Sequence, residues 1–210
     1  MNTFQIEALS ITVATFVLSF LLAFYMTRKY KKTKAKSLLF WSSGMQAFSI
    51  GVFLEVLFAL GITTNFLTGF YLFLVALIVE LLALGSIQLI KSKAIKKVYY
   101  AFCIVTTLLL LYSVVSSNTS GFVVNYVAWG VPPILVTIFS TLITIPASAV
   151  LLVVAIKSYL KTRNTKMLSI IAGVVFVVIA GTLYIVAFPS LLYISEFVGI
   201  LLLWYGFYSG

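Results

Sequence analysis

The stretch that decides the fold is "YLFLVALIVELLALGSIQLI", residues 71–90, a run of apolar side chains with one carboxylate, Glu80, near its middle. A helix that crosses the hydrocarbon core of a bilayer needs about 20 apolar residues. This run is long enough, so it predicts a membrane-spanning helix. It belongs to a longer apolar stretch at residues 64–90, and six similar stretches occur at residues 5–27, 37–60, 97–116, 132–156, 167–188 and 190–209. We therefore expect an all-α, polytopic membrane protein in which residues 1–210 form one domain of seven transmembrane helices.

The composition of the chain agrees with this prediction. Of its 210 residues 63% are hydrophobic and 9% are charged, and the mean hydropathy is +1.20. Soluble domains carry about 25% charged residues. The composition therefore also predicts a multi-pass membrane protein, and we expect it in the cell membrane.

The net charge of +10 comes from lysines and arginines that all lie in three loops, after the first, third and fifth predicted spans. They are Arg28, Lys29, Lys31, Lys32, Lys34 and Lys36; Lys91, Lys93, Lys96 and Lys97; and Lys157, Lys161, Arg163 and Lys166. Cytoplasmic loops carry the excess of basic residues in membrane proteins, so we expect the N-terminus outside and the C-terminus in the cytoplasm. The basic loops also attract anionic lipid headgroups. This distribution favours a lipid partner and gives no indication of nucleic-acid binding.

Some residue types are missing. The chain has no histidine and one cysteine, Cys103, which excludes a disulfide framework and makes a metal site or histidine-ligated haem unexpected. The seven-span topology resembles that of the heptahelical rhodopsins, which hold retinal on a lysine of the last helix. The last predicted span, "SLLYISEFVGILLLWYGFYSG" at 190–210, contains no lysine. We therefore expect no metal, no haem and no retinal.

Two predicted spans carry a stripe of hydroxyl side chains. Thr12, Thr15 and Ser19 recur at helical spacing in the first span, and Thr137, Ser140, Thr141 and Thr144 recur in the fifth. Both spans run from outside to inside. Spans one to three and five to seven can therefore be parallel repeats joined by the fourth span, a 3+1+3 plan.

Three glutamates lie inside predicted spans: Glu55 in the second, Glu80 in the third and Glu196 in the seventh. An ionised carboxylate in hydrocarbon costs about 2.5 to 3.5 kcal/mol even on the more lenient scale, and no lysine or arginine lies at the same depth. We expect all three to face the interior of the bundle and most to be protonated. Glu55 and Glu196 lie near the outer helix ends and can pair. Glu80 lies roughly 24 Å from the outer end of its span, at about 1.5 Å per residue. The hydroxyl stripes can link it to the other two glutamates.

The longest outer loop, residues 116–133, contains the tripeptide Asn118-Thr119-Ser120. This is an acceptor sequence for N-glycosylation on the expected outer side. Asn118 is therefore a glycosylation candidate.

The polar interior has two interpretations. Buried hydroxyl and carboxyl groups can simply join helices, at about 0.6 kcal/mol per hydrogen bond. Alternatively, they form a binding or transport site for a small solute, a proton or a lipid-soluble ligand, and this is the function that we favour.

Two other functions stay open. One is a non-catalytic accessory or scaffold subunit of a larger membrane complex, for example a respiratory one, in which case partner subunits or further copies of the chain bind. The least favoured is an intramembrane enzyme that uses a glutamate as general acid, as carotenoid cyclases are thought to do. The segment "PSLLYISEF" at 189–197 resembles their acidic motifs only in part.

Overall fold

The computed structural model describes residues 3–128, 130–163, 168–173, 175–176 and 189–208. Its elements are α1 (Thr3–Thr33), α2 (Lys36–Ala59), α3 (Asn65–Ile87), α4 (Lys93–Ser116), a short 3-10 helix η1 (Ser120–Phe122), strands β1 (Val123–Val124) and β2 (Val127–Ala128), α5 (Ile134–Thr162) and α7 (Pro189–Tyr208). Apart from one small hairpin, the described elements are helical, as the sequence predicts. The predicted span 167–188 lies mostly outside the described residues.

Five described helices, α1 to α5, are long and apolar enough to cross a membrane, and a shorter apolar stretch, Tyr193–Phe207, lies in α7. These helices are consistent with a membrane-spanning protein. The number of seven spans, the orientation in the membrane and the 3+1+3 repeat stay predictions.

Local sequence explains where several helices begin and end. The side chains of Thr64 and Ser92 accept hydrogen bonds from backbone N–H groups in the first turns of α3 and α4, which satisfies donors that the helix itself cannot pair. α1 continues past the predicted end of its span through the basic segment, since lysine and arginine are good helix formers. The residue that follows α1, Lys34, has a φ of 55°, and the residue that follows α5, Arg163, has a φ of 52°. Left-handed residues commonly end helices in this way.

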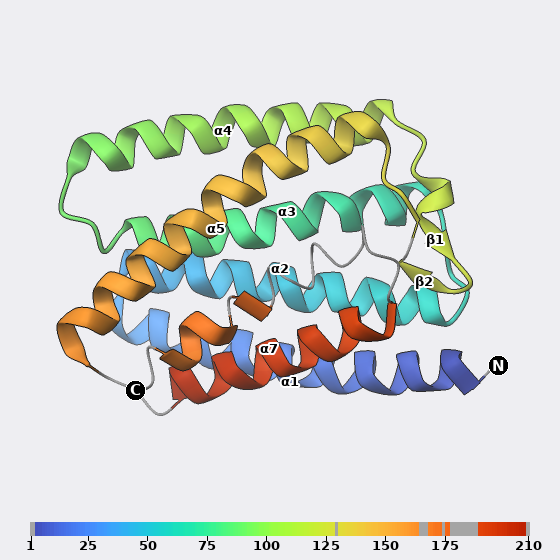
Figure 1. The fold of residues 1–210 in the computed structure, drawn as a ribbon, viewed down its shortest axis with the longest axis horizontal. Helices are drawn as coiled ribbons and strands as arrows, with labels where there is room; N and C mark the ends of the chain where they lie inside the picture. Colours follow the sequence, from blue (N-terminus) through green and yellow to red (C-terminus); the bar gives the residue numbers. More distant parts are fainter. Residues whose placement is uncertain (1–2, 129, 164–167, 174, 177–188, 209–210) are drawn as a thin grey trace.

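Consecutive helices run antiparallel and pack side by side (Figure 1). α1 contacts α2 and α7, α2 contacts α3, α3 contacts α5, and α4 lies at the edge against α3 and α5. The α1–α2 and α3–α4 loops and the end of α5 lie together at the left of Figure 1. These segments carry the lysines and arginines, and we call this the basic end. The N-terminus, the α2–α3 loop and the hairpin lie at the opposite end, the hairpin end.

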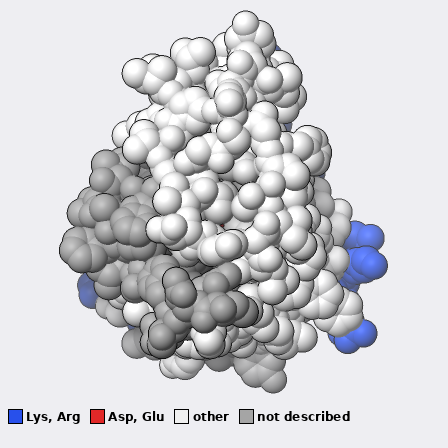
Figure 2. All heavy atoms as spheres, turned by 90° about the vertical axis from the view of Figure 1, so that its right-hand side faces the viewer, with Lys and Arg blue, Asp and Glu red and all other residues white. Residues whose placement is uncertain are grey.

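The hairpin end carries little charge. Seen from this end, the described surface is almost entirely uncharged, and lysines and arginines are visible only at its rim (Figure 2). Charge is therefore strongly asymmetric along the bundle, which is the pattern expected if the basic end faces the cytoplasm.

Small residues bring the helices close together. A Cβ added to Gly44 of α2 would lie 3.1 Å from the Leu82 side chain of α3, and one added to Gly69 of α3 would lie 3.0 Å from Val114 of α4. Glycine at such positions lets helix backbones approach, as is usual in membrane bundles.

Large apolar side chains cover one outer face of α4. Ile104, Leu108, Leu111 and Val115 recur at helical spacing and are exposed, Val115 by 78%. Exposed apolar surface of this extent marks contact with lipid or with another protein. Its presence on the helix at the edge of the bundle agrees with a membrane environment.

The hairpin forms a cover over one end of the bundle. Val123 pairs with Ala128 and Val124 with Val127, and the two turn residues, Asn125 and Tyr126, both have positive φ, as a type I′ turn requires. The segment before the hairpin is fixed to the start of α3, because the Thr119 N–H donates to Asn65 Oδ1 at 2.6 Å and the Thr119 hydroxyl reaches Asn65 O at 2.9 Å. We call this contact the Asn65–Thr119 clasp.

Candidate functional site

Two of the three glutamates meet near the hairpin end. Glu55 stands one turn before the end of α2 and Glu196 two turns after the start of α7, and their carboxyl groups lie close enough to share a proton. Glu55 is 2% exposed and Glu196 9%. The structure therefore brings together the two carboxylates that the sequence predicts to be at similar depth.

Among the described residues, the Tyr71 side chain also reaches the pair. The Tyr71 hydroxyl of α3 donates to Glu55 Oε1 at 2.6 Å. This contact follows from the antiparallel packing of α2 and α3, which places the end of one beside the start of the other. Glu55 Oε2 is buried, and within the described part of the chain no group other than the Glu196 carboxyl is placed to donate to it.

Aromatic rings and the hairpin close the pair off from water. The Tyr71 ring packs edge-on against Phe58 at 5.6 Å and lies 6.0 Å from Phe122. Tyr193, one helical turn before Glu196, is buried, and its hydroxyl is hydrogen-bonded to the backbone of Ala128 in β2. The strand β2 therefore covers the site at the hairpin end.

The chemistry of this pair is that of a shared proton. No ion pair occurs among the described residues, so no basic side chain there neutralises the two acids. Two carboxyl groups in contact in a low-dielectric interior cannot both be ionised, because their charges repel and neither is solvated. A proton on Glu196 would supply the donor that Glu55 Oε2 lacks.

Glu80 belongs to a separate polar cluster between α3 and α4. Its Oε2 accepts a hydrogen bond from Thr107 at 2.6 Å, and its Oε1 lies 3.5 Å from the Thr106 hydroxyl. Cys103, one turn earlier on α4, adjoins Glu80. Glu80 is 2% exposed, so all three glutamates of the predicted spans are buried, as expected.

The first hydroxyl stripe lies in the interior. Thr12, Thr15 and Ser19 are buried on the face of α1 that continues with Leu22 and Met26. The Thr15 hydroxyl donates to Ile11 O at 2.8 Å and the Ser19 hydroxyl to Phe16 O at 2.9 Å, within the helix itself. These two hydroxyl groups therefore donate to backbone carbonyls of their own helix.

The second stripe lies at the boundary of the bundle. Thr137, Ser140 and Thr144 are half-buried and Thr141 is exposed. The buried face of α5 is instead apolar and is formed by Val136, Ile143, Ala147 and Leu151 at helical spacing. Thr137 and Thr144 of the stripe each follow a residue of this face in the sequence, so the stripe lies beside it. The hydrogen-bond partners of Glu80 come from α4 rather than from either stripe.

Sequence reasoning missed the partners of the glutamates: Tyr71, Tyr193, Thr106 and Thr107. The position of Tyr193, three residues before Glu196, is a signal that was available, because residues at this spacing share a helix face. The candidate Asn118 is exposed, and its Oδ1 accepts from the Ser120 hydroxyl at 2.7 Å.

Among the described residues, no group of three or more side chains of the metal-binding types comes together. Comparisons with protein-family models, with curated protein sequences and with solved structures find no match for this chain. The class that fold and composition support is thus a helical membrane protein with buried carboxyl groups, and its function rests on the site alone.

Proposed function

We propose that this protein binds and releases protons at the Glu55–Glu196 pair, and that the protonation state of the pair controls the binding or passage of a small solute through the bundle. The observation that carries the proposal is the contact between two buried carboxyl groups without a basic partner in the described residues.

The geometry around Glu55 favours one proton shared by the pair. The 2.6 Å bond from Tyr71 has the length usual for a hydroxyl that donates to a carboxylate, about 2.5 to 2.7 Å. In this state Glu55 is the carboxylate and Glu196 the acid. Uptake of a second proton makes both groups neutral and removes the charge of the pair. Release of that proton restores the charge.

A buried charge that appears and disappears is a means of control. Packed aromatic rings and β2 surround the pair. A packed site of this kind switches between discrete arrangements, and we expect the charged and the neutral pair to favour different ones. The pair joins α2, α3 and α7, so the change acts on three helices at once.

The direct test is infrared difference spectroscopy of the full chain in lipid nanodiscs between acid and alkaline pH. We expect a protonated-carboxyl band that both Glu55→Gln and Glu196→Gln alter, because each group is the hydrogen-bond partner of the other. The matched control is Glu7→Gln, the same chemical change outside the pair, which should leave this shared component in place. A spectrum in which the two variants alter no common component would contradict the proposal.

The second test measures function in liposomes that contain a pH-sensitive dye. A potassium diffusion potential should drive proton movement through wild type and through Glu7→Gln, and much less through either variant of the pair. Equal proton movement in all of them, together with constant co-purification of other proteins, would favour the accessory-subunit function instead.

A further inference from the structure

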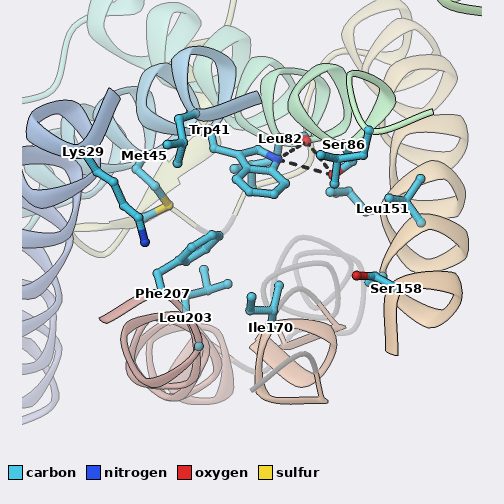
Figure 3. A pocket seen from close by; sticks show the side chains of 15 residues that line it. Lys29, Trp41, Met45, Leu82, Ser86, Leu151, Ser158, Ile170, Leu203 and Phe207 are labelled. Atoms are coloured by element: carbon cyan, nitrogen blue, oxygen red, sulfur yellow. Dashed lines mark hydrogen bonds between the residues drawn. The ribbon is translucent and has the colours of Figure 1, made fainter. Parts of the chain in front are cut away.

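A pocket of about 290 Å³ opens among the helix ends at the basic end of the molecule (Figure 3). Its wall is formed by α1, α2, α3, α5 and α7 and by residue 170. Apolar side chains make up most of this wall, including Met45, Leu82, Leu151, Leu203 and Phe207. It lies at the opposite end of the bundle from the carboxyl pair, so its role does not depend on proton binding there.

One cation lines this pocket. Lys29 reaches from α1 toward Met45 and Phe207 (Figure 3). Its side chain is half-buried, and the part of the chain that the structure describes contains no ion pair that would neutralise it. A lysine stem on apolar surface with its ammonium group at the edge is a suitable partner for an anionic head group.

The indole of Trp41 forms a fixed wall. Its N–H donates to Leu82 O at 3.0 Å and lies 3.4 Å from Ser86 Oγ, and its ring packs edge-on against Phe207 at 5.4 Å. With its N–H already bonded, the indole offers the pocket mainly an apolar face. Small-molecule sites combine such apolar walls with a few polar groups that orient the ligand.

We propose that this pocket binds a single-chain anionic amphiphile, a molecule with one small acidic head group and one apolar chain. Lys29 binds the head group, and the chain lies along Trp41, Leu82 and Leu203. The pocket volume of about 290 Å³ is at the lower limit of ligand sites, about 300 Å³, which suits one chain rather than the two of a phospholipid. The surrounding basic loops concentrate anions at this end.

The test uses Trp41 as reporter in a variant with Trp129→Phe and Trp204→Phe, which leaves one tryptophan. The probes are bromoundecanoate, the matched bromoundecanol and a brominated phosphatidylglycerol, since bromine quenches indole fluorescence at contact. We expect saturable quenching by the carboxylate at lower concentration than by the alcohol. Quenching by the phospholipid alone, which the carboxylate does not displace, would overturn the proposal and assign the pocket to bulk lipid.

Two substitutions locate the site. Lys29→Met should weaken binding of the carboxylate about tenfold or more, because it removes a charge-assisted contact, and should leave binding of the alcohol unchanged. Lys32→Met makes the same charge change at an exposed position one turn further along α1 and should bind like the parent.

Ala155→Leu adds volume to the pocket wall and should abolish quenching by the carboxylate while the emission of Trp41 without probe persists. Equal affinity of the Lys29→Met and Lys32→Met variants for the carboxylate, or unchanged quenching in Ala155→Leu, would overturn the assignment.

Discussion

The hydrogen bond from Tyr71 to Glu55 offers a measurement of the charge on the carboxyl pair. Tyr71→Phe removes one hydroxyl from a buried site and keeps the ring that packs against Phe58 and Phe122. The cost of this change depends on the acceptor. A hydrogen bond to a charged group contributes about 1.5 to 3 kcal/mol, whereas a neutral bond between membrane helices contributes about 0.6 kcal/mol on average.

With one proton shared by the pair, Glu55 is the charged partner. We therefore expect Tyr71→Phe to lower the free energy of unfolding by about 1.5 to 3 kcal/mol in the parent protein. In a Glu55→Gln background the acceptor is a neutral amide, and the cost should fall to about 0.6 kcal/mol. The coupling energy of this double-mutant cycle is then about 1 to 2 kcal/mol.

The assay is unfolding of the purified protein by sodium dodecyl sulfate in mixed micelles, followed by circular dichroism. Tyr112→Phe is the matched control, because Tyr112 is 69% exposed on α4 and its hydroxyl should contribute little to stability. A Tyr71→Phe cost that is the same in both backgrounds would refute the reasoning, since it would mean that Glu55 carries no charge.

Three further predictions concern other parts of the molecule. Thr107→Val removes the 2.6 Å donor to Glu80 and should lower the free energy of unfolding by about 0.6 to 1.7 kcal/mol; no loss in the same micelle assay would mean that this bond contributes nothing. Gly85→Ala places a Cβ against the indole of Trp41, so the ring must move, at a cost of about 1 to 3 kcal/mol, and a tryptophan emission spectrum identical to wild type would contradict this. Expression in a glycosylating eukaryotic cell should attach a glycan to Asn118, seen as a mass shift that is absent in Asn118→Gln; an unmodified chain would argue against an outer position for this loop.

Much of the helical pattern is readable from the sequence, because apolar runs of membrane length have few alternatives to a helix. The second run, predicted at 37–60, appears as Lys36–Ala59, and the third, predicted at 64–90, appears as Asn65–Ile87. The larger differences are at α1, which continues to Thr33 instead of residue 27, and at α5, which continues to Thr162 instead of residue 156. Hydropathy marks where lipid contact ends and does not mark where the helix ends.

Burial of the glutamates was also predictable, since an unpaired carboxylate facing lipid is costly. Depth along each helix then identified Glu55 and Glu196 as a pair, because residues at equal depth on adjacent helices can meet. Rotation about the helix axis is harder to predict. Thr141 lies outside the bundle because α5 turns an apolar face to α3, and periodicity alone does not say which of two adjacent stripes is buried. Nothing in the sequence identifies Thr107 as the partner of Glu80, because an isolated threonine in an apolar helix is common.

The Asn65–Thr119 clasp should affect how fast the buried acids exchange protons, and not how tightly they bind them. It holds η1 and the hairpin against the start of α3, and it contacts neither carboxyl group. Water that reaches Glu196 between β2 and Tyr193 must separate these two, and the clasp, which holds the segment before β1, opposes that separation. Loosening it leaves the two acids and their nearest contacts unchanged. Such a variant would exchange hydrogen for deuterium sooner at the buried acids, yet settle at the same final occupancy.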